Sequence, residues 1–214
     1  MTTTHLTYIF DPLCGWCYGA GPALETLRAL EGVSISLAPS GLFAGAGARP
    51  MDREFAAFAW QNDQRIAQMT GQTFSQAYRD NVLAAPAGSL DSGTATLGIV
   101  ATGLTAGPEH ELPALKALQQ ARYADGRDNT RLESVAAILT DAGFGDAAAR
   151  LADADADLLA ACSERIEAAR ADMARFGLQG VPALIAERDG QRGLVPPGAL
   201  FGDLDALVRH LTAA

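Results

Sequence analysis

Two of the three cysteines, Cys14 and Cys17, are three residues apart in residues 11–17, which read DPLCGWC and follow an apolar run. At this spacing, in the first turn of a helix, both sulfurs lie on one side and are close enough to form and break a disulfide. The start of a helix offers unpaired N–H groups and the positive end of the dipole, which favour a thiolate over a thiol. Because the thiolate is the nucleophile, we expect Cys14 to attack. Cys17, further in and more buried, would then resolve the mixed disulfide.

Other uses of this cysteine pair are weaker. A zinc site needs four ligands, but the sequence has no second close pair, and Cys162, His5, His110 and His210 occur singly. We therefore predict no metal site. A permanent disulfide between Cys14 and Cys17 would close too short a loop to remove much unfolded-state entropy. A reducing compartment also keeps thiols reduced, and an odd number of cysteines leaves one unpaired. Two packing thiols remain an open alternative.

Charge and hydropathy exclude several classes of partner. The 214 residues contain 16 basic and 25 acidic side chains, for a formal net charge of −9, and no block of lysine or arginine. Such a surface repels phosphate backbones, so we expect no nucleic-acid partner. The longest apolar stretch, 95–106, is too short to cross a bilayer, and the N-terminus lacks the pattern of a secretory signal. We expect a cytoplasmic protein with no membrane partner.

The first fifty residues predict a βαβ unit that positions the cysteines. Residues 6–10 are apolar and aromatic, as in a buried strand, and a turn follows at Asp11-Pro12. A helix should run from Cys14 to Gly32, bent by Pro22. Residues 33–37 alternate with period two and predict a second strand. The cysteines therefore fall at the first junction between strand and helix.

In the rest of the chain the sequence pattern changes twice, first to helical periodicity and then back to that of strands. Residues 50–177 show helical periodicity broken by glycine and proline, which indicates five or six helices. The last of these has an apolar stripe that includes Cys162, so we expect that thiol to be a packing residue, and a polar face over 163–175 with glutamate–arginine pairs four residues apart. Residues 182–186 and 192–195 then predict a hairpin around Asp189-Gly190. A closing helix follows over 200–211.

These patterns predict an α/β protein in three parts. Residues 1–49 form the first half of one domain (βαβ), residues 50–154 a helical insertion domain, and residues 155–214 the second half (α-β-β-α).

The junction of strand and CGWC motif, with Pro22 five residues after Cys17, resembles the thioredoxin superfamily. The helical block between the two halves resembles its DsbA-like branch, and DPLCGWCYG at 11–19 is similar to the predicted cytoplasmic protein-disulfide isomerases related to FrnE. The resemblance implies a thioredoxin fold with a large helical insertion. It also implies a thiol–disulfide oxidoreductase or isomerase acting on protein or peptide disulfides or small thiols, with no cofactor beyond glutathione as a redox partner.

A second landmark, Gly180-Val181-Pro182, stands just before the third predicted strand. The resemblance implies a cis peptide at Val181-Pro182, beside the cysteines, where the backbone of Val181 binds substrate; an ordinary trans proline opening a strand is the alternative. Gly15 and Trp16 would contact substrate as well. Strongly oxidising relatives have histidine where this chain has Trp16, so the resemblance leaves the direction of electron flow open.

Two further functions compete with disulfide exchange. The same branch includes glutathione-dependent isomerases and kappa-class transferases, whose closing-helix entrance is similar to Leu200-Phe201-Gly202-Asp203, although they generally have serine at the position of Cys14. A helix N-terminus there can bind a carboxylate. The third hypothesis is a non-catalytic binding module that keeps the fold.

Overall fold

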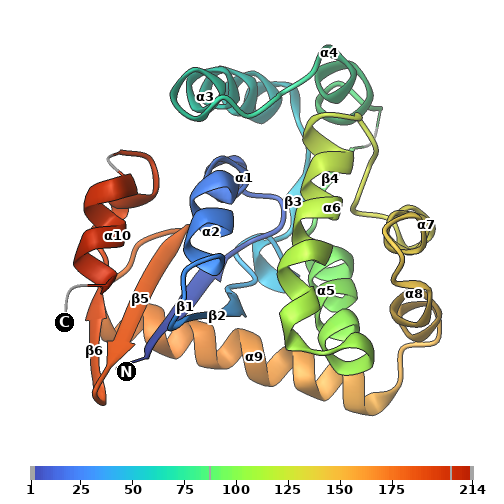
Figure 1. Cartoon of the computed structure of the whole chain (residues 1–214). Helices are drawn as coiled ribbons and strands as arrows, with labels where there is room; N and C mark the ends of the chain where they lie inside the picture. Colours follow the sequence, from blue (N-terminus) through green and yellow to red (C-terminus); the bar gives the residue numbers. More distant parts are fainter. Residues whose placement is uncertain (1–2, 87, 203, 213–214) are drawn as a thin grey trace.

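The computed structural model describes residues 3–86, 88–202 and 204–212. A four-stranded sheet in the order β2-β1-β5-β6 forms its centre (Figure 1). Strand β1 (Thr4–Phe10) pairs in parallel with β2 (Val33–Pro39) and antiparallel with β5 (Ala183–Arg188). The two ends of the sequence therefore share one sheet, as the thioredoxin fold requires.

The alternating side chains of β1 divide the core into two layers. Leu6, Tyr8 and Phe10 pack in the larger cluster, with residues of α2 (Gly21–Arg28) and α10 (Leu204–Thr212). Ile9 points to the other face, where it packs with Ala169 of α9 (Ala156–Arg175). In a strand, successive side chains point to opposite faces, so β1 is buried from both sides and holds the first junction rigidly.

The predicted first helix is divided into two. Helix α1 (Gly15–Gly19) ends before α2 begins at Gly21, with Ala20 between them. Pro22 has no N–H to donate to Tyr18 one turn earlier, and the Tyr18 carbonyl instead accepts from Nε2 of Gln72, at 2.9 Å. Helix α2 also stops at Arg28, short of the predicted end at Gly32, and Gly32 adopts a φ of 76° in the turn to β2.

The C-terminal hairpin was predicted correctly. Strand β5 pairs antiparallel with β6 (Gln191–Leu194), and the turn residues Asp189 and Gly190 have φ values of 51° and 74°. Positive φ at both central residues is the geometry that an Asp-Gly turn supplies. A short 3₁₀ helix, η4 (Pro197–Leu200), precedes α10, so the closing helix begins later than predicted.

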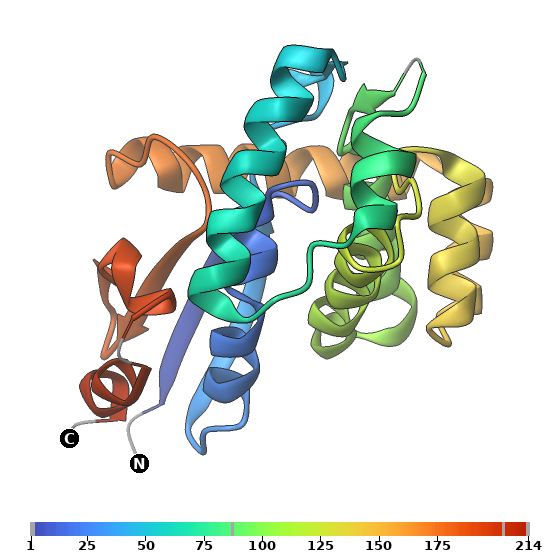
Figure 2. The same ribbon diagram turned by 90° about the horizontal axis from the view of Figure 1, so that it is seen from above.

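Six helices of at least eight residues occur within described residues 50–177, in agreement with the predicted five or six. They are α3 (Arg53–Thr70), α5 (Gly93–Ala106), α6 (Glu111–Tyr123), α7 (Leu132–Asp141), α8 (Gly145–Ala152) and α9. Figure 2 shows α3 crossing over the start of α1, at the end of the sheet that carries the cysteines.

Smaller elements of the helical block were not predicted. These are the two-residue strands β3 (Arg49–Pro50) and β4 (Ser89–Leu90), the helical turn α4 (Gln76–Tyr78), the π-helical turn η2 (Arg79–Leu83), and the 3₁₀ turns η1 (Gly45–Gly47) and η3 (Pro108–His110). Strands β3 and β4 pair with each other antiparallel. Runs this short carry too little periodicity to be recognised in a sequence.

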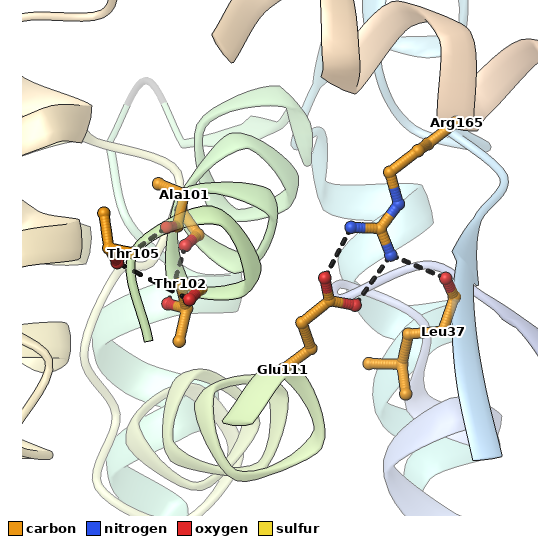
Figure 3. A network of polar contacts seen from close by, with 7 residues as sticks. Leu37, Ala101, Thr102, Thr105, Glu111 and Arg165 are labelled. Carbon is orange, nitrogen blue, oxygen red and sulfur yellow. Dashed lines mark hydrogen bonds and ion pairs between the residues drawn. The ribbon is translucent and has the colours of Figure 1, made fainter. Parts of the chain in front are cut away.

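The predicted solvated face of α9 is wrong for Arg165, which is half-buried, whereas Arg170 is exposed as predicted but also reaches the sheet side of the molecule. Arg165 donates two hydrogen bonds of 2.6 Å to the carboxylate of Glu111 on α6 and one of 2.7 Å to the carbonyl of Leu37 on β2 (Figure 3). Arg170 donates to the carbonyls of Ser40 and Gly41, each at 3.0 Å. These side chains therefore join α9 to the helical block and the sheet, a long-range pairing that spacing along one helix cannot reveal.

No helix among the described residues has the length and apolar character needed to cross a membrane.

Candidate active site

Cys14 is the N-cap residue of α1. Its backbone is extended, with φ −86° and ψ 117°, and its Sγ accepts a hydrogen bond of 3.4 Å from the N–H of Cys17. The turn at residues 11–13 ends the strand and leaves the first helical N–H groups unpaired, so a side-chain acceptor at this position satisfies one of them. The sulfur of Cys14 thus occupies the place that serine or aspartate takes in other helices.

Cys17 is one turn further in and is more deeply buried, with 1% of its surface exposed against 8% for Cys14. Both cysteines are free thiols, and their side chains are hydrogen-bonded to each other. Burial raises the pKa of Cys17 well above its ordinary value, the neighbouring Cys14 raises it further, and a hydrogen bond with the backbone of Asp11 acts against the rise. The two sulfurs face each other, and the inner one holds its proton firmly.

Asp11 fixes the loop that leads to Cys14. It is fully buried, and its carboxylate accepts hydrogen bonds from the N–H of Leu13 at 2.9 Å, the N–H of Phe43 at 3.0 Å and the hydroxyl of Ser92 at 2.7 Å. Burial raises the pKa of Asp11, and these three donors act against that rise. The sequence predicts only a turn at Asp11, because its partners Phe43 and Ser92 come from the chain beyond the motif.

The second landmark lies beside the first. The peptide bond between Val181 and Pro182 is cis, and Sγ of Cys14 is 3.5 Å from the carbonyl oxygen of Val181. The predicted site residues of the two halves, 167 positions apart in sequence, are therefore in contact. Val181 is partly buried against two core clusters.

A cavity of about 270 Å³ opens beside Cys14, Gly15 and Trp16. Its lining is mainly apolar. Leu13 and Phe43 come from the first fifty residues, and the helical block contributes Met51, Phe55, Phe58, Ala59, Ile66 and Leu90. Trp16 is half-buried and packs edge-on against Phe201, with ring centroids 5.1 Å apart. Of the predicted substrate contacts, Gly15 and Trp16 line this cavity, while Val181 and Pro182 are not among its lining residues.

An aromatic cluster attaches the helical block to the motif. Tyr18, next to Cys17, stacks on Tyr123 of α6 with centroids 4.8 Å apart and packs against Phe74. The hydroxyl of Tyr123 donates to the carbonyl of Leu13 at 2.8 Å. The insertion is therefore packed directly on the residues flanking the cysteines, which positions the cavity over Cys14.

The sequence does not single out Asp63, Tyr78 and Arg122, which are among the polar side chains that line the cavity. Asp63 on α3 is 4% exposed and accepts a hydrogen bond of 2.9 Å from the hydroxyl of Tyr78. Arg122 on α6 is 1% exposed, and its guanidinium lies 5.7 Å from the ring centroid of Tyr78. Nothing in the local sequence marks them, because each falls within an ordinary helical pattern and only the fold brings them together.

The remaining candidate residues lie elsewhere. Cys162 is 9% exposed within an apolar cluster, as predicted for a packing thiol. The ring nitrogens of His5 are hydrogen-bonded with the hydroxyls of Ser34 and Ser36, and His110 packs against the ring of Phe144. Asp203 and the side chain of His210 fall outside the described residues. Within the described chain, no group of three or more His, Cys, Asp or Glu side chains is arranged to hold a metal.

Comparison with known proteins finds the same architecture. Residues 6–211 match the family model of the DSBA-like thioredoxin domain. The cytosolic disulfide reductase DsbM from Pseudomonas aeruginosa is similar at 29% identity and a TM-score of 0.86, over 98% of this chain and all of the other. Its structure with GSH gives 27% identity and a TM-score of 0.82, over 97% of this chain and 96% of the other.

More distant structures share the fold alone. Oxidoreductase DsbA from Xylella fastidiosa is 17% identical with a TM-score of 0.53, over 99% of this chain and 88% of the other. A 2-hydroxychromene-2-carboxylate isomerase is 18% identical with a TM-score of 0.61, over 96% and 95%. A search of curated protein sequences found no match.

Proposed function

The chain belongs to the DSBA-like thioredoxin domain family and is a thiol–disulfide oxidoreductase, and we propose that Cys14 is its nucleophile and Cys17 its resolving thiol. The observation that carries the proposal is the position of Cys14: its sulfur caps α1 and lies 3.5 Å from the Val181 carbonyl, on the less buried side of the pair. A substrate disulfide reaches this sulfur before it reaches Cys17.

In the first step the Cys14 thiolate attacks one sulfur of a substrate disulfide. A bond forms between Cys14 and that sulfur, the substrate S–S bond breaks, and the second substrate sulfur keeps the electron pair, takes up a proton and leaves. Hydrogen bonding from the Cys17 N–H, together with the N-terminal end of α1, stabilises the negative charge on Cys14 before attack.

In the second step Cys17 loses its proton and attacks the sulfur of Cys14. The substrate leaves as a thiol, and the enzyme is left with a Cys14–Cys17 disulfide, which an external thiol of the glutathione class must reduce. The raised pKa of Cys17 keeps it protonated while Cys14 reacts, which fixes the order of the two sulfurs. Trp16, Gly15 and the backbone of Val181 would contact the substrate chain.

The substrates we propose are disulfides of proteins or peptides, or of small thiols, and the compartment we propose is the cytoplasm. Two observations support this choice: a similar protein is a cytosolic disulfide reductase with a structure containing GSH, and the charge of −9 disfavours nucleic acid. In a reducing compartment, reduction or isomerisation is favoured over net oxidation.

One observation favours a second function, glutathione-dependent turnover of a small molecule. The cavity beside Cys14 is mainly apolar and has the size of a small organic ligand. Cys17 would be dispensable for that chemistry, because no mixed disulfide needs resolving. A Cys17→Ser variant that keeps full turnover of a glutathione adduct, while wild type reduces no disulfide, would establish this function in place of exchange.

Trapping of the mixed disulfide tests the proposal. Cys17→Ser should accumulate an adduct on Cys14 when mixed with glutathione disulfide or an oxidised peptide, whereas Cys14→Ser should form none. Cys162→Ser is the matched control and should turn over like wild type, since that thiol lies in a separate cluster. Mass spectrometry of the digested protein locates the adduct, and an adduct carried by Cys17 would reverse the assigned roles.

A further inference from the structure

Asp63 is a buried carboxyl group at the active-site cavity. It lies on α3, is 4% exposed, and lines the cavity together with Cys14, Gly15 and Trp16. Its Oδ1 is so close to the backbone of Gly15 that a Cβ at that position would overlap it. The carboxyl group is therefore packed against the first residue of α1, immediately after the reactive sulfur.

The neighbours of Asp63 leave it without a compensating cation in contact. Its Oδ2 accepts from the Tyr78 hydroxyl, and among the described residues it makes no ion pair. The other charged or titratable groups around the cavity are Arg49 on β3, Arg122 and Tyr123 on α6, and Cys14. Burial raises the pKa of Asp63 to about 7, although Tyr78 and Arg122 act in the opposite direction. Near neutral pH this group holds its proton for part of the time.

We propose that Asp63 is the general acid of the exchange reaction, delivering its proton to the substrate sulfur that leaves when Cys14 attacks. This rests on the proposed function, because it needs Cys14 as the nucleophile. The electron pair of the broken S–S bond stays on the leaving sulfur, which takes the proton and departs as a thiol, and Asp63 becomes a carboxylate. Water then returns a proton to it.

The need for such an acid depends on the leaving group. An alkyl thiol has a high pKa and leaves slowly as a thiolate, whereas an acidic aryl thiol leaves readily without a proton. A positioned general acid contributes about 10²–10⁴-fold. Asp63 should therefore matter for alkyl disulfides such as glutathione disulfide and hardly matter for an aromatic disulfide such as dithiobis(nitrobenzoate).

Single-turnover kinetics of the reduced protein with these two disulfides tests the proposal. Asp63→Asn should slow the reaction with glutathione disulfide by about 10²-fold and leave the rate with the aromatic disulfide nearly unchanged. Equal losses with both disulfides, or no loss with either, would overturn it. Failure of wild type to react with either disulfide would instead refute the proposed function, so the two failures are distinguishable.

Tyr78→Phe gives a second test that keeps the carboxyl group. The Tyr78 hydrogen bond lowers the pKa of Asp63, so its removal raises that pKa and keeps the acid form to higher pH. In wild type, the ratio of the alkyl to the aromatic rate should fall as pH rises through about 7. In Tyr78→Phe this fall should move to higher pH, and a ratio independent of pH in both proteins would contradict the proposal.

Discussion

Two buried carboxyl groups of the helical block, Asp63 and Glu111, have the same exposure of 4% and opposite surroundings. Glu111 accepts two hydrogen bonds of 2.6 Å from Arg165, whereas Asp63 accepts one from the neutral hydroxyl of Tyr78 and has its pKa raised by burial to about 7. Each lies against a glycine whose Cβ would overlap it, Gly103 for Glu111 and Gly15 for Asp63.

The two carboxyl groups have different roles: Glu111 holds two helices together, and Asp63 is available for proton transfer. A buried carboxylate that a guanidinium binds through two hydrogen bonds fixes the relation of two elements, here α6 and α9. A buried carboxyl group without a contacting cation can exchange a proton near neutral pH, and strongly perturbed groups of this kind concentrate in functional clefts. Asp63, the carboxyl group without a contacting cation, lines the cavity at the cysteine pair.

The largest expected effect comes from breaking the paired carboxylate. Arg165→Met leaves Glu111 buried without its partner, which should cost about 3 kcal/mol of unfolding free energy. Urea denaturation measures this, and the double variant Arg165→Met/Glu111→Gln should recover most of the loss. The rate of disulfide exchange in folded protein should be unchanged. A fall in that rate as large as the one expected for Asp63→Asn would show that the Glu111–Arg165 pair also acts in the reaction.

The buried carboxyl group of Asp63 predicts that the free energy of unfolding depends on pH. Its pKa rises from 3.8 to about 7 on folding, so the native state retains a proton that the unfolded chain loses between those values. The contribution of Asp63 to the free energy of unfolding is therefore greatest at low pH and is lost as the pH rises to about 7. Asp63→Asn removes this decline, so its stability relative to wild type should improve by about 2 kcal/mol between pH 5 and pH 8. No change in the difference would contradict the raised pKa.

The smallest expected effects come from the glycines that lie against the two carboxyl groups, Gly103 beside Glu111 and Gly15 beside Asp63. Gly103→Ala and Gly15→Ala each force a methyl group onto a carboxyl oxygen, at a cost of about 1–3 kcal/mol for overpacking. Because Arg165 holds Glu111 in place, Gly103→Ala should be the more destabilising by thermal unfolding and should leave exchange intact. Gly15→Ala should instead slow exchange by displacing Asp63. The reverse pattern would show that Gly103 acts at the site.

The local structure around the cysteine motif was predictable from sequence, and the residues that pack on the motif from distant elements were not. The strands flanking residues 11–17, the Asp-Gly hairpin and the burial of Cys162 follow from periodicity and turn chemistry that neighbouring residues carry. The position of the Gly180-Val181-Pro182 landmark came from resemblance, and the structure brings Val181 to Cys14. The division at 1–49, 50–154 and 155–214 stays a prediction.

The sequence does not reveal contacts between residues far apart in the chain, as three residues of the site show: Asp11, Asp63 and Arg122. Asp63 on α3 and Arg122 on α6 fall on helices whose pattern fits an ordinary amphipathic surface, and only the packing of these helices against the cysteine motif makes both residues line the cavity. Asp11 looks like a turn residue because its partners Phe43 and Ser92 are distant in sequence. Arg165 was assigned to a solvated face for the same reason.

Selective alkylation tests the central claim, that Cys14 is the activated thiol, most directly. A brief pulse of iodoacetamide at pH 6 on the reduced protein, followed by peptide mass spectrometry, ranks the three thiols by reactivity. The account predicts label on Cys14 first, with Cys17 and Cys162 protected because burial raises the pKa of each. Label on Cys17 or Cys162 before Cys14, or uniform labelling of all three, would contradict it.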